Sequence, residues 1–78
     1  MFNKYKIDFI WDDEAGVWIA TSEDDDISGL VLEHESFEGL VHEVRLAIPL
    51  LLDINNRVFN NLTLDFVAHR QESLVCSG

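Results

Sequence analysis

The strongest pattern in the chain is a series of apolar residues, three or four positions apart, that begins at Phe37. These residues are Phe37, Leu40, Val41, Val44, Ala47, Ile48, Leu51 and Leu52. The spacing is that of an amphipathic helix, which must bury its apolar stripe against another element. Pro49 conflicts with it, because a proline inside a helix removes one backbone hydrogen bond and costs about 3 kcal/mol. We therefore expect a helix over about 37–54 that bends near 45–48, or one that ends early in a turn.

Ser36 is placed to begin this helix. Its hydroxyl can accept a hydrogen bond from a free backbone N–H of the first turn. Glu35 and Glu38 lie where the helix dipole favours negative charge. Gly39 occupies the third helical position, where a complete capping box has Glu or Gln. The sequence therefore predicts an N-cap at Ser36 without the reciprocal bond.

The rest of the chain has the composition of strands and turns. Between Tyr5 and Trp11 apolar residues alternate with mostly charged ones, as in a strand with one buried face. The turn sequence DDEAG follows, and β-branched and aromatic residues after it favour a hairpin. The expected strands are residues 5–11, 17–22, 30–35 and 62–69, and the expected loops are 23–29 and 55–61.

These elements give the order β-β-β-α-β. The predicted fold is a single small α+β domain over 1–78, with one helix packed on one face of a mainly antiparallel sheet. Its core spans about 4–70, and residues 71–78 are expected to form a disordered tail. One helix leaves the other face of the sheet uncovered, and a patch there favours a homo-oligomer, most simply a dimer. The residues expected in this patch are Ile10, Trp18, Val31 and Val67.

Charge is distributed unevenly along the chain. The formal net charge is −10, and residues 1–39 carry eleven acids against two lysines, or −9 of it. Nucleic-acid binding relies on clustered Lys and Arg, so direct DNA or RNA binding is not expected. A basic protein is the natural complement of such a chain. No apolar run approaches the roughly 18 residues of a membrane span, so membrane insertion is not expected either.

Residues suited to catalysis or metal binding are present but do not form known motifs. Asp24, Asp25 and Asp26 lack the spacing of a calcium-binding loop, so a solvated or partner-facing loop is favoured over a metal site. The three histidines, His34, His42 and His69, are too far apart in sequence for a zinc motif. No serine lies in a nucleophile elbow. The sequence predicts a binding module that is not an enzyme and uses no cofactor.

Cys76 is the single cysteine in the chain. One cysteine cannot form an internal disulfide, and it has no second cysteine with which to hold a metal. Charges at Lys4, Lys6 and Asp8 interrupt any signal-peptide core near the N-terminus. We therefore expect a cytoplasmic protein.

Three local stretches resemble the HicB-like antitoxin family, and in particular its group of solitary, uncharacterised small domains. The first is a strand of the form G-x-W/Y-x-A, the second is a loop that ends in glycine, and the third is a capped helix. The corresponding residues are Gly16, Trp18 and Ala20, then Ile27, Ser28 and Gly29, then Ser36, Leu40, Val44 and Ile48. The resemblance covers about residues 4–70.

The resemblance implies a degenerate ribonuclease-H-like sheet that has lost nuclease activity. HicB antitoxins use such a domain to cap HicA, a small basic toxin ribonuclease, and carry a C-terminal DNA-binding domain. This chain ends a few residues after its last predicted strand, so we expect it to lack that DNA-binding domain. Two alternatives remain: a solitary structural homo-oligomer without a toxin, and a domain with residual metal-dependent nuclease activity.

The acids of two predicted loops suggest where a basic partner would bind. We expect them to form one negative rim at one end of the sheet that attracts a basic protein surface. The rim would consist of Asp12, Asp13, Glu14, Glu23, Asp24, Asp25 and Asp26. A second interpretation, in which these acids only keep the domain in solution, has comparable weight.

Overall fold

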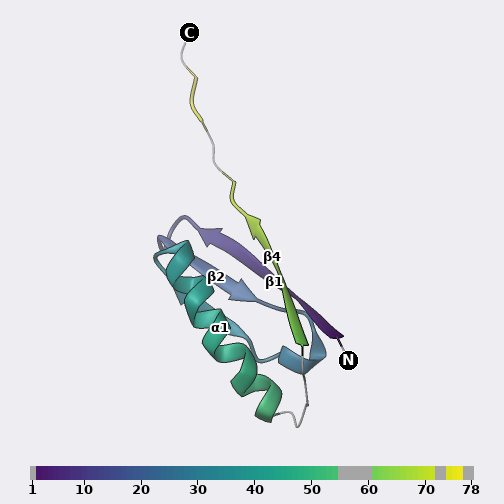
Figure 1. Cartoon of the computed structure of the whole chain (residues 1–78). Helices are drawn as coiled ribbons and strands as arrows, with labels where there is room; N and C mark the ends of the chain where they lie inside the picture. The colour runs from purple at the N-terminus through teal and green to yellow at the C-terminus, as the bar shows by residue number, and fades with distance from the viewer. Residues whose placement is uncertain (1, 55–60, 72–73, 77–78) are drawn as a thin grey trace.

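A computed structural model describes residues 2–54, 61–71 and 74–76 of the chain, with the side chains of residues 2 and 3 left out. The elements follow the predicted order β-β-β-α-β with one short 3₁₀ turn added (Figure 1). They are β1 (Phe2–Asp12), β2 (Val17–Thr21), η1 (Asp25–Ile27), β3 (Val31–His34), α1 (Phe37–Ile54) and β4 (Asn61–His69). The predicted α+β class is confirmed. Of the predicted loop at 55–61, residues 55–60 lie outside the described residues, and Asn61 is the first residue of β4.

The strands form one mixed sheet in the order β3-β2-β1-β4. β1 pairs with β2, and β2 with β3, in antiparallel orientation, while β4 lies parallel to β1. Parallel neighbours require a crossover connection, and α1 lies in the segment of chain between β3 and β4. Figure 1 shows α1 crossing one face of the sheet. The opposite face, which we call the open face, carries no described element.

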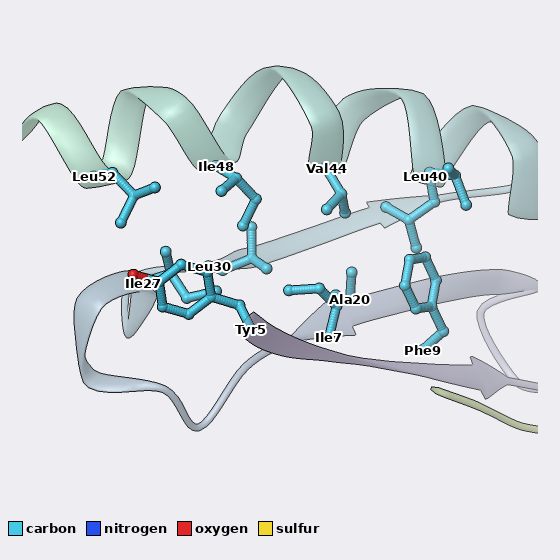
Figure 2. Packing of buried hydrophobic residues seen from close by; sticks show 11 residues of the cluster. Tyr5, Ile7, Phe9, Ala20, Ile27, Leu30, Leu40, Val44, Ile48 and Leu52 are labelled. Carbon is cyan, nitrogen blue, oxygen red and sulfur yellow. The ribbon is translucent and has the colours of Figure 1, made fainter. Parts of the chain in front are cut away.

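The core lies between α1 and the sheet (Figure 2). The helix contributes its predicted stripe, and β1 contributes alternate residues that point toward it. Ile27 of η1 and Leu30 close one end of this layer. The buried apolar residues are Tyr5, Ile7, Phe9, Ala20, Ile27, Leu30, Leu40, Val41, Val44, Ile48 and Leu52.

Aromatic rings extend the core at its other end. Phe37 at the start of α1 packs between Phe9 and Trp18, with ring centroids 4.9 and 5.1 Å away. Trp11 meets Trp18 edge to face at 5.5 Å, because these two residues are directly paired between β1 and β2. Phe66 of β4 adds an edge contact to Phe9 at 5.3 Å. Such pairs contribute about 0.5–1.5 kcal/mol each beyond the area they bury.

The placement of Trp18 corrects one prediction. We expected it on the open face, but its pairing with Trp11 puts it on the face that α1 covers. Ile10 and Val31 are exposed on the open face as predicted, at 48% and 70% of their full accessible areas. Val67 is half-buried there. The register explains the outcome, because Ile10 pairs with Ile19, so Trp18 must point the other way.

The helix continues through Pro49 to Ile54, so the expectation that it ends early is wrong. Ile48 and Leu52, on either side of the proline, are both buried between α1 and the sheet (Figure 2). Their burial stabilises the last helical turns by roughly 1.5–3 kcal/mol per side chain. That gain offsets the cost of the proline.

The predicted N-cap is confirmed. The amide of Gly39 donates to Ser36 Oγ at 3.2 Å, and Leu40 N donates to the Ser36 carbonyl at 2.9 Å. The amide of Ser36 itself donates to Nδ1 of His34 at 2.9 Å. This last bond takes the place of the Glu side chain that a capping box would supply.

The predicted tail is only partly described. Gln71 and residues 74–76 have no regular secondary structure, and all of them are exposed. Residues 72–73 and 77–78 lie outside the described residues.

Candidate protein-binding surfaces

The first group of predicted site residues builds the turn between β1 and β2. Asp12 Oδ1 accepts hydrogen bonds from the amides of Glu14 and Ala15 at 3.1 and 3.2 Å. The amide of Gly16 donates to the Asp12 carbonyl at 2.8 Å, and its φ of 68° is the left-handed conformation that glycine adopts without strain. Asp12 therefore serves the turn itself, as Asx residues commonly do.

Asp13 and Glu14 project from this turn. Trp11 Nε1 donates to Asp13 Oδ1 at 3.2 Å, and both acids are exposed. The carboxylate of Glu14 makes no hydrogen bond or ion pair with any described residue. Glu14 is thus the acid of the turn that is freest to meet a partner.

The second group of predicted site residues lies in the loop after β2. Side chains of this loop bond to the backbone of β1 beyond the point where its pairing with β2 ends. Pairing of β1 with β2 begins at Asp8 and Thr21, so the Lys6 backbone has no strand partner on that side. Asp24 Oδ2 accepts from Lys6 N at 2.9 Å, and Ser22 Oγ donates to the Lys6 carbonyl at 2.7 Å. Two side chains thereby satisfy backbone groups that would otherwise lie open.

Asp26 also has a structural role in this loop. Tyr5 is buried to 5% exposure, and its hydroxyl donates to Asp26 Oδ2 at 2.8 Å. The buried tyrosine thus keeps its polar end paired. Glu23 and Asp25 are exposed, and their side chains make no hydrogen bond or ion pair with the described residues. The acidic run therefore alternates between residues that hold the loop and residues that face solvent.

The two acidic groups do not form the single rim that we expected. Residues 12–14 precede β2 and residues 23–26 follow it, so the groups lie at opposite ends of that strand. The five residues of β2 span roughly 17 Å at about 3.3 Å per residue. The seven acids therefore make two separate negative surfaces, and a partner that contacts both must bridge the length of β2.

The histidines and the cysteine are dispersed. His34 packs against the start of α1, His42 is exposed on α1, and His69 Nε2 lies 4.0 Å from Asp8 Oδ1 on the open face. Cys76 is exposed. Among the described residues, no three His, Cys, Asp or Glu side chains gather closely enough to hold a metal ion.

The sequence analysis did not predict an apolar surface that lies beside α1. Leu46, Leu50 and Ile54 are 56%, 65% and 73% exposed on the helix, and Leu50 lines a groove between α1 and the start of β3. The signal was present, because these residues are spaced by four and form a second stripe beside the core stripe. We call this surface the α1–β3 flank. It consists of Gly29, Leu30, Val31, Leu32, Leu46, Ala47, Leu50, Leu51 and Ile54.

Two further contacts involve side chains of β1. The Arg70 guanidinium stacks over the Trp11 ring, 4.6 Å from its centroid, beside the last residues of β4. On the open face, Lys6 Nζ lies 3.8 Å from Asp8 Oδ1. Exposed pairs of this kind contribute about 0–1 kcal/mol.

In the described part of the chain, no helix is both long and apolar enough to cross a membrane.

A four-stranded mixed sheet with one helix on one face, two acidic turns and an uncovered apolar flank defines a small α+β domain. The family model described as "Domain of unknown function (DUF1902)" matches residues 4–77, and the chain belongs to this family. No curated protein matches it.

A solved structure gives the same fold. The chain is similar to a hypothetical protein from the extremely thermophilic bacterium Thermus thermophilus, whose crystal structure superimposes with a TM-score of 0.76. The two sequences are 33% identical, and the match covers 92% of this chain and 100% of the other.

Proposed function

We propose that this chain is a cytoplasmic, non-enzymatic protein-binding module of the HicB-like antitoxin type, which neutralises a small basic toxin ribonuclease by capping it. The observation that carries the proposal is the arrangement of the acids. Glu14, Glu23 and Asp25 are exposed, and their side chains have no cationic partner among the described residues. The whole chain has a net charge of −10.

This charge pattern favours a basic partner for a physical reason. Opposite fields accelerate the encounter of two proteins and restrict the choice of partner more than they add affinity. An acid that serves only the fold is held by hydrogen bonds, as Asp24 and Asp26 are. Acids that project without such bonds remain available to an incoming cationic surface.

The test is co-expression of the chain with a small basic protein encoded beside its gene. We expect the basic protein alone to arrest growth, and we expect the chain to restore growth and to co-purify with it. Growth arrest that the chain does not relieve would contradict the antitoxin role. A neighbouring basic protein without ribonuclease activity would contradict the toxin assignment.

The contribution of the acids can be separated from their structural role. Exchanging Glu23 and Asp25 for lysine should slow association by about tenfold and weaken its salt dependence. The control variant carries Glu38→Lys and Asp65→Lys, which make the same change in net charge at exposed positions elsewhere. Equal rates for the two variants would show that net charge, and not these two loop acids, steers the encounter.

A second candidate function is a structural homo-oligomer without a toxin. The observation that favours it is the open face, where Ile10 and Val31 are exposed and Ile19 pairs beside Ile10. Light scattering on the purified chain tests it. A dimer that Ile10→Glu converts to a monomer would support this candidate, and a wild-type monomer would contradict it.

A further inference from the structure

Three of the exposed apolar side chains form one line on α1. In the described part of the chain, the large ones fall into three groups: Ile10 and Val31 on the open face, Leu74 and Val75 after β4, and a line of three along α1. The line along α1 is Leu46, Leu50 and Ile54, and Val31 lies at the edge strand that borders it. Contiguous exposed apolar surface of this kind marks an interaction site more often than scattered residues do.

The helix and the strand contribute complementary parts of this α1–β3 flank. Leu46, Leu50 and Ile54 are four residues apart, so they form one line along α1. Ala47 and Leu51, next to that line, border a groove whose other wall is the chain from Gly29 to Leu32. The groove is therefore apolar on both walls.

β3 offers a free edge beside the groove. It is the terminal strand of the sheet, and no described strand pairs with its outer side. A strand added there would place alternate side chains on opposite faces of the sheet. The side chain opposite Leu32 would enter the groove toward Leu50, because Leu32 shares the helix-covered face with its partner Ala20. In the added strand, the residues before and after that one would point to the open face, and they would pair with Val31 and Glu33.

The charged residues that the structure describes beside Leu50 and on β3 are acids. Glu33 is exposed on the edge strand, and Glu43 lies seven residues before Leu50, on the same side of the helix. Asp53 follows Leu50 by three residues and is also exposed. Arg45 is displaced from Leu50 by five residues, which places it well around the helix. Among the described residues, an incoming segment would therefore meet acids and no Lys or Arg along this side.

We propose that the α1–β3 flank binds an extended segment of a basic protein partner, which adds to β3 as a fifth strand. The proposal rests on the proposed function and specifies the surface through which it acts. The segment presents three consecutive side chains: Lys or Arg opposite Glu33, an apolar residue in the groove against Leu50, and an apolar residue opposite Val31. Cross-strand pairs of opposite charge and of apolar groups both stabilise such a pairing.

A second copy of the chain fits the flank less well. A copy paired through its own β3 would bring a second Glu33, Glu43 and Asp53 to the same acidic surface. Like charges that face each other across an interface disfavour the pairing. A strand that carries Lys or Arg has the opposite sign.

The experiment selects ligands without assuming a partner. A displayed library of random 12-residue peptides is panned against the purified chain, and enriched peptides are synthesised and titrated by NMR. We expect enriched sequences in which Lys or Arg precedes or follows a pair of apolar residues. We expect the amide shifts to change at residues 29–34 and 46–54. Enrichment of acidic sequences, no enrichment, or shifts confined to other surfaces would overturn the proposal.

Two exposed positions supply the decisive variants. Leu50→Ser should weaken the selected peptides by about tenfold, since it removes the apolar wall of the groove. Its control is Leu74→Ser, at a leucine that is 82% exposed after β4. Glu33→Lys should weaken the same peptides by about threefold or more, and Glu38→Lys is its control. Affinities that stay within twofold of wild type for both Leu50→Ser and Glu33→Lys would overturn the proposal.

The design separates this inference from the proposed function. If a basic partner binds normally to Leu50→Ser and Glu33→Lys but poorly to the variant with lysine at positions 23 and 25, the function stands and the flank is not its site. If light scattering shows a wild-type dimer that Leu50→Ser dissociates, the flank is a self-interface and the proposal fails. If selected peptides bind the flank but no basic protein is neutralised, the flank stands and the antitoxin role fails.

Discussion

His34 and Gly39 form a contact that joins the third strand to the first turn of the helix. His34 Nδ1 accepts from the Ser36 amide, so in the neutral ring the proton lies on Nε2. A Cβ on Gly39 would lie 2.6 Å from both ring nitrogens, closer than any real contact. A side chain at the position where a capping box has Glu would therefore force the His34 ring to move. Glycine at this position leaves room for the His34 ring, which accepts from the Ser36 amide in place of a Glu side chain.

Gly39→Ala should destabilise the protein, although alanine is the better helix former by about 1 kcal/mol. The new methyl group must displace the His34 ring, which costs the Ser36 amide its acceptor, so we expect a net loss of about 1–2 kcal/mol in the free energy of unfolding. In a His34→Ala background the same change should be neutral or stabilising. Urea unfolding of the four proteins gives the coupling. A Gly39→Ala variant as stable as wild type would contradict the clash.

At the scale of elements, α1 shows how burial overrides a local signal. Pro49 lies within the helix and is exposed, while Ile48 and Leu52 beside it are buried. The proline cannot donate to the carbonyl four residues earlier, that of Arg45. The last turns of the helix are therefore held by the core and by the sheet, and not by an unbroken ladder of backbone bonds.

Pro49→Ala should raise the free energy of unfolding by about 1–3 kcal/mol. The replacement restores one helical hydrogen bond and removes the ring clash, while it gives back some freedom to the unfolded chain. Urea unfolding measures the change, and Leu46→Ala is a matched control because it changes an exposed residue of the same helix without altering the backbone. A Pro49→Ala protein less stable than wild type would mean that the proline is compensated by contacts that alanine cannot make.

The elements also show which parts of the fold a sequence reveals. The helix and β1 were predictable because each has one buried face, so its apolar residues recur at the regular spacing of a helix or a strand. β2 was ambiguous, since Val17, Trp18, Ile19 and Ala20 are apolar on both faces, and only the register with β1 decides which side Trp18 takes. η1 was missed because a single buried residue, Ile27, follows four acids and gives no period.

The candidate site was less predictable than the fold. Acids are conspicuous in a sequence, but the hydrogen bonds of Asp12, Asp24 and Asp26 exist only once the backbone groups they satisfy are in place. The separation of the two acidic turns by β2 likewise follows from the hairpin geometry. The α1–β3 flank depends on a chain segment and a helix that meet only in the folded protein.

At the scale of the whole molecule, negative charge is the dominant property. The chain carries 15 acids and five lysines or arginines. Excess charge of one sign destabilises a compact state by self-repulsion. Among the described acids, Asp8 lies near Lys6 and His69, Asp12 and Asp24 accept from neutral backbone amides, and Glu14, Glu23 and Asp25 have no cationic partner among the described residues. The domain therefore tolerates repulsion that a cationic partner would relieve.

The repulsion predicts a salt-dependent stability. The Debye length falls from about 30 Å at 0.01 M to about 3 Å at 1 M ionic strength, so sodium chloride screens the acids from one another. We expect the free energy of unfolding to rise by about 1 kcal/mol between these limits, measured by urea unfolding at each salt concentration. The variant with Glu23→Gln and Asp25→Asn removes two exposed charges that have no described partner, and its slope should be shallower. Stability that is independent of sodium chloride, or that falls as it is added, would show that the fold does not store this repulsion and that a basic partner has none to relieve.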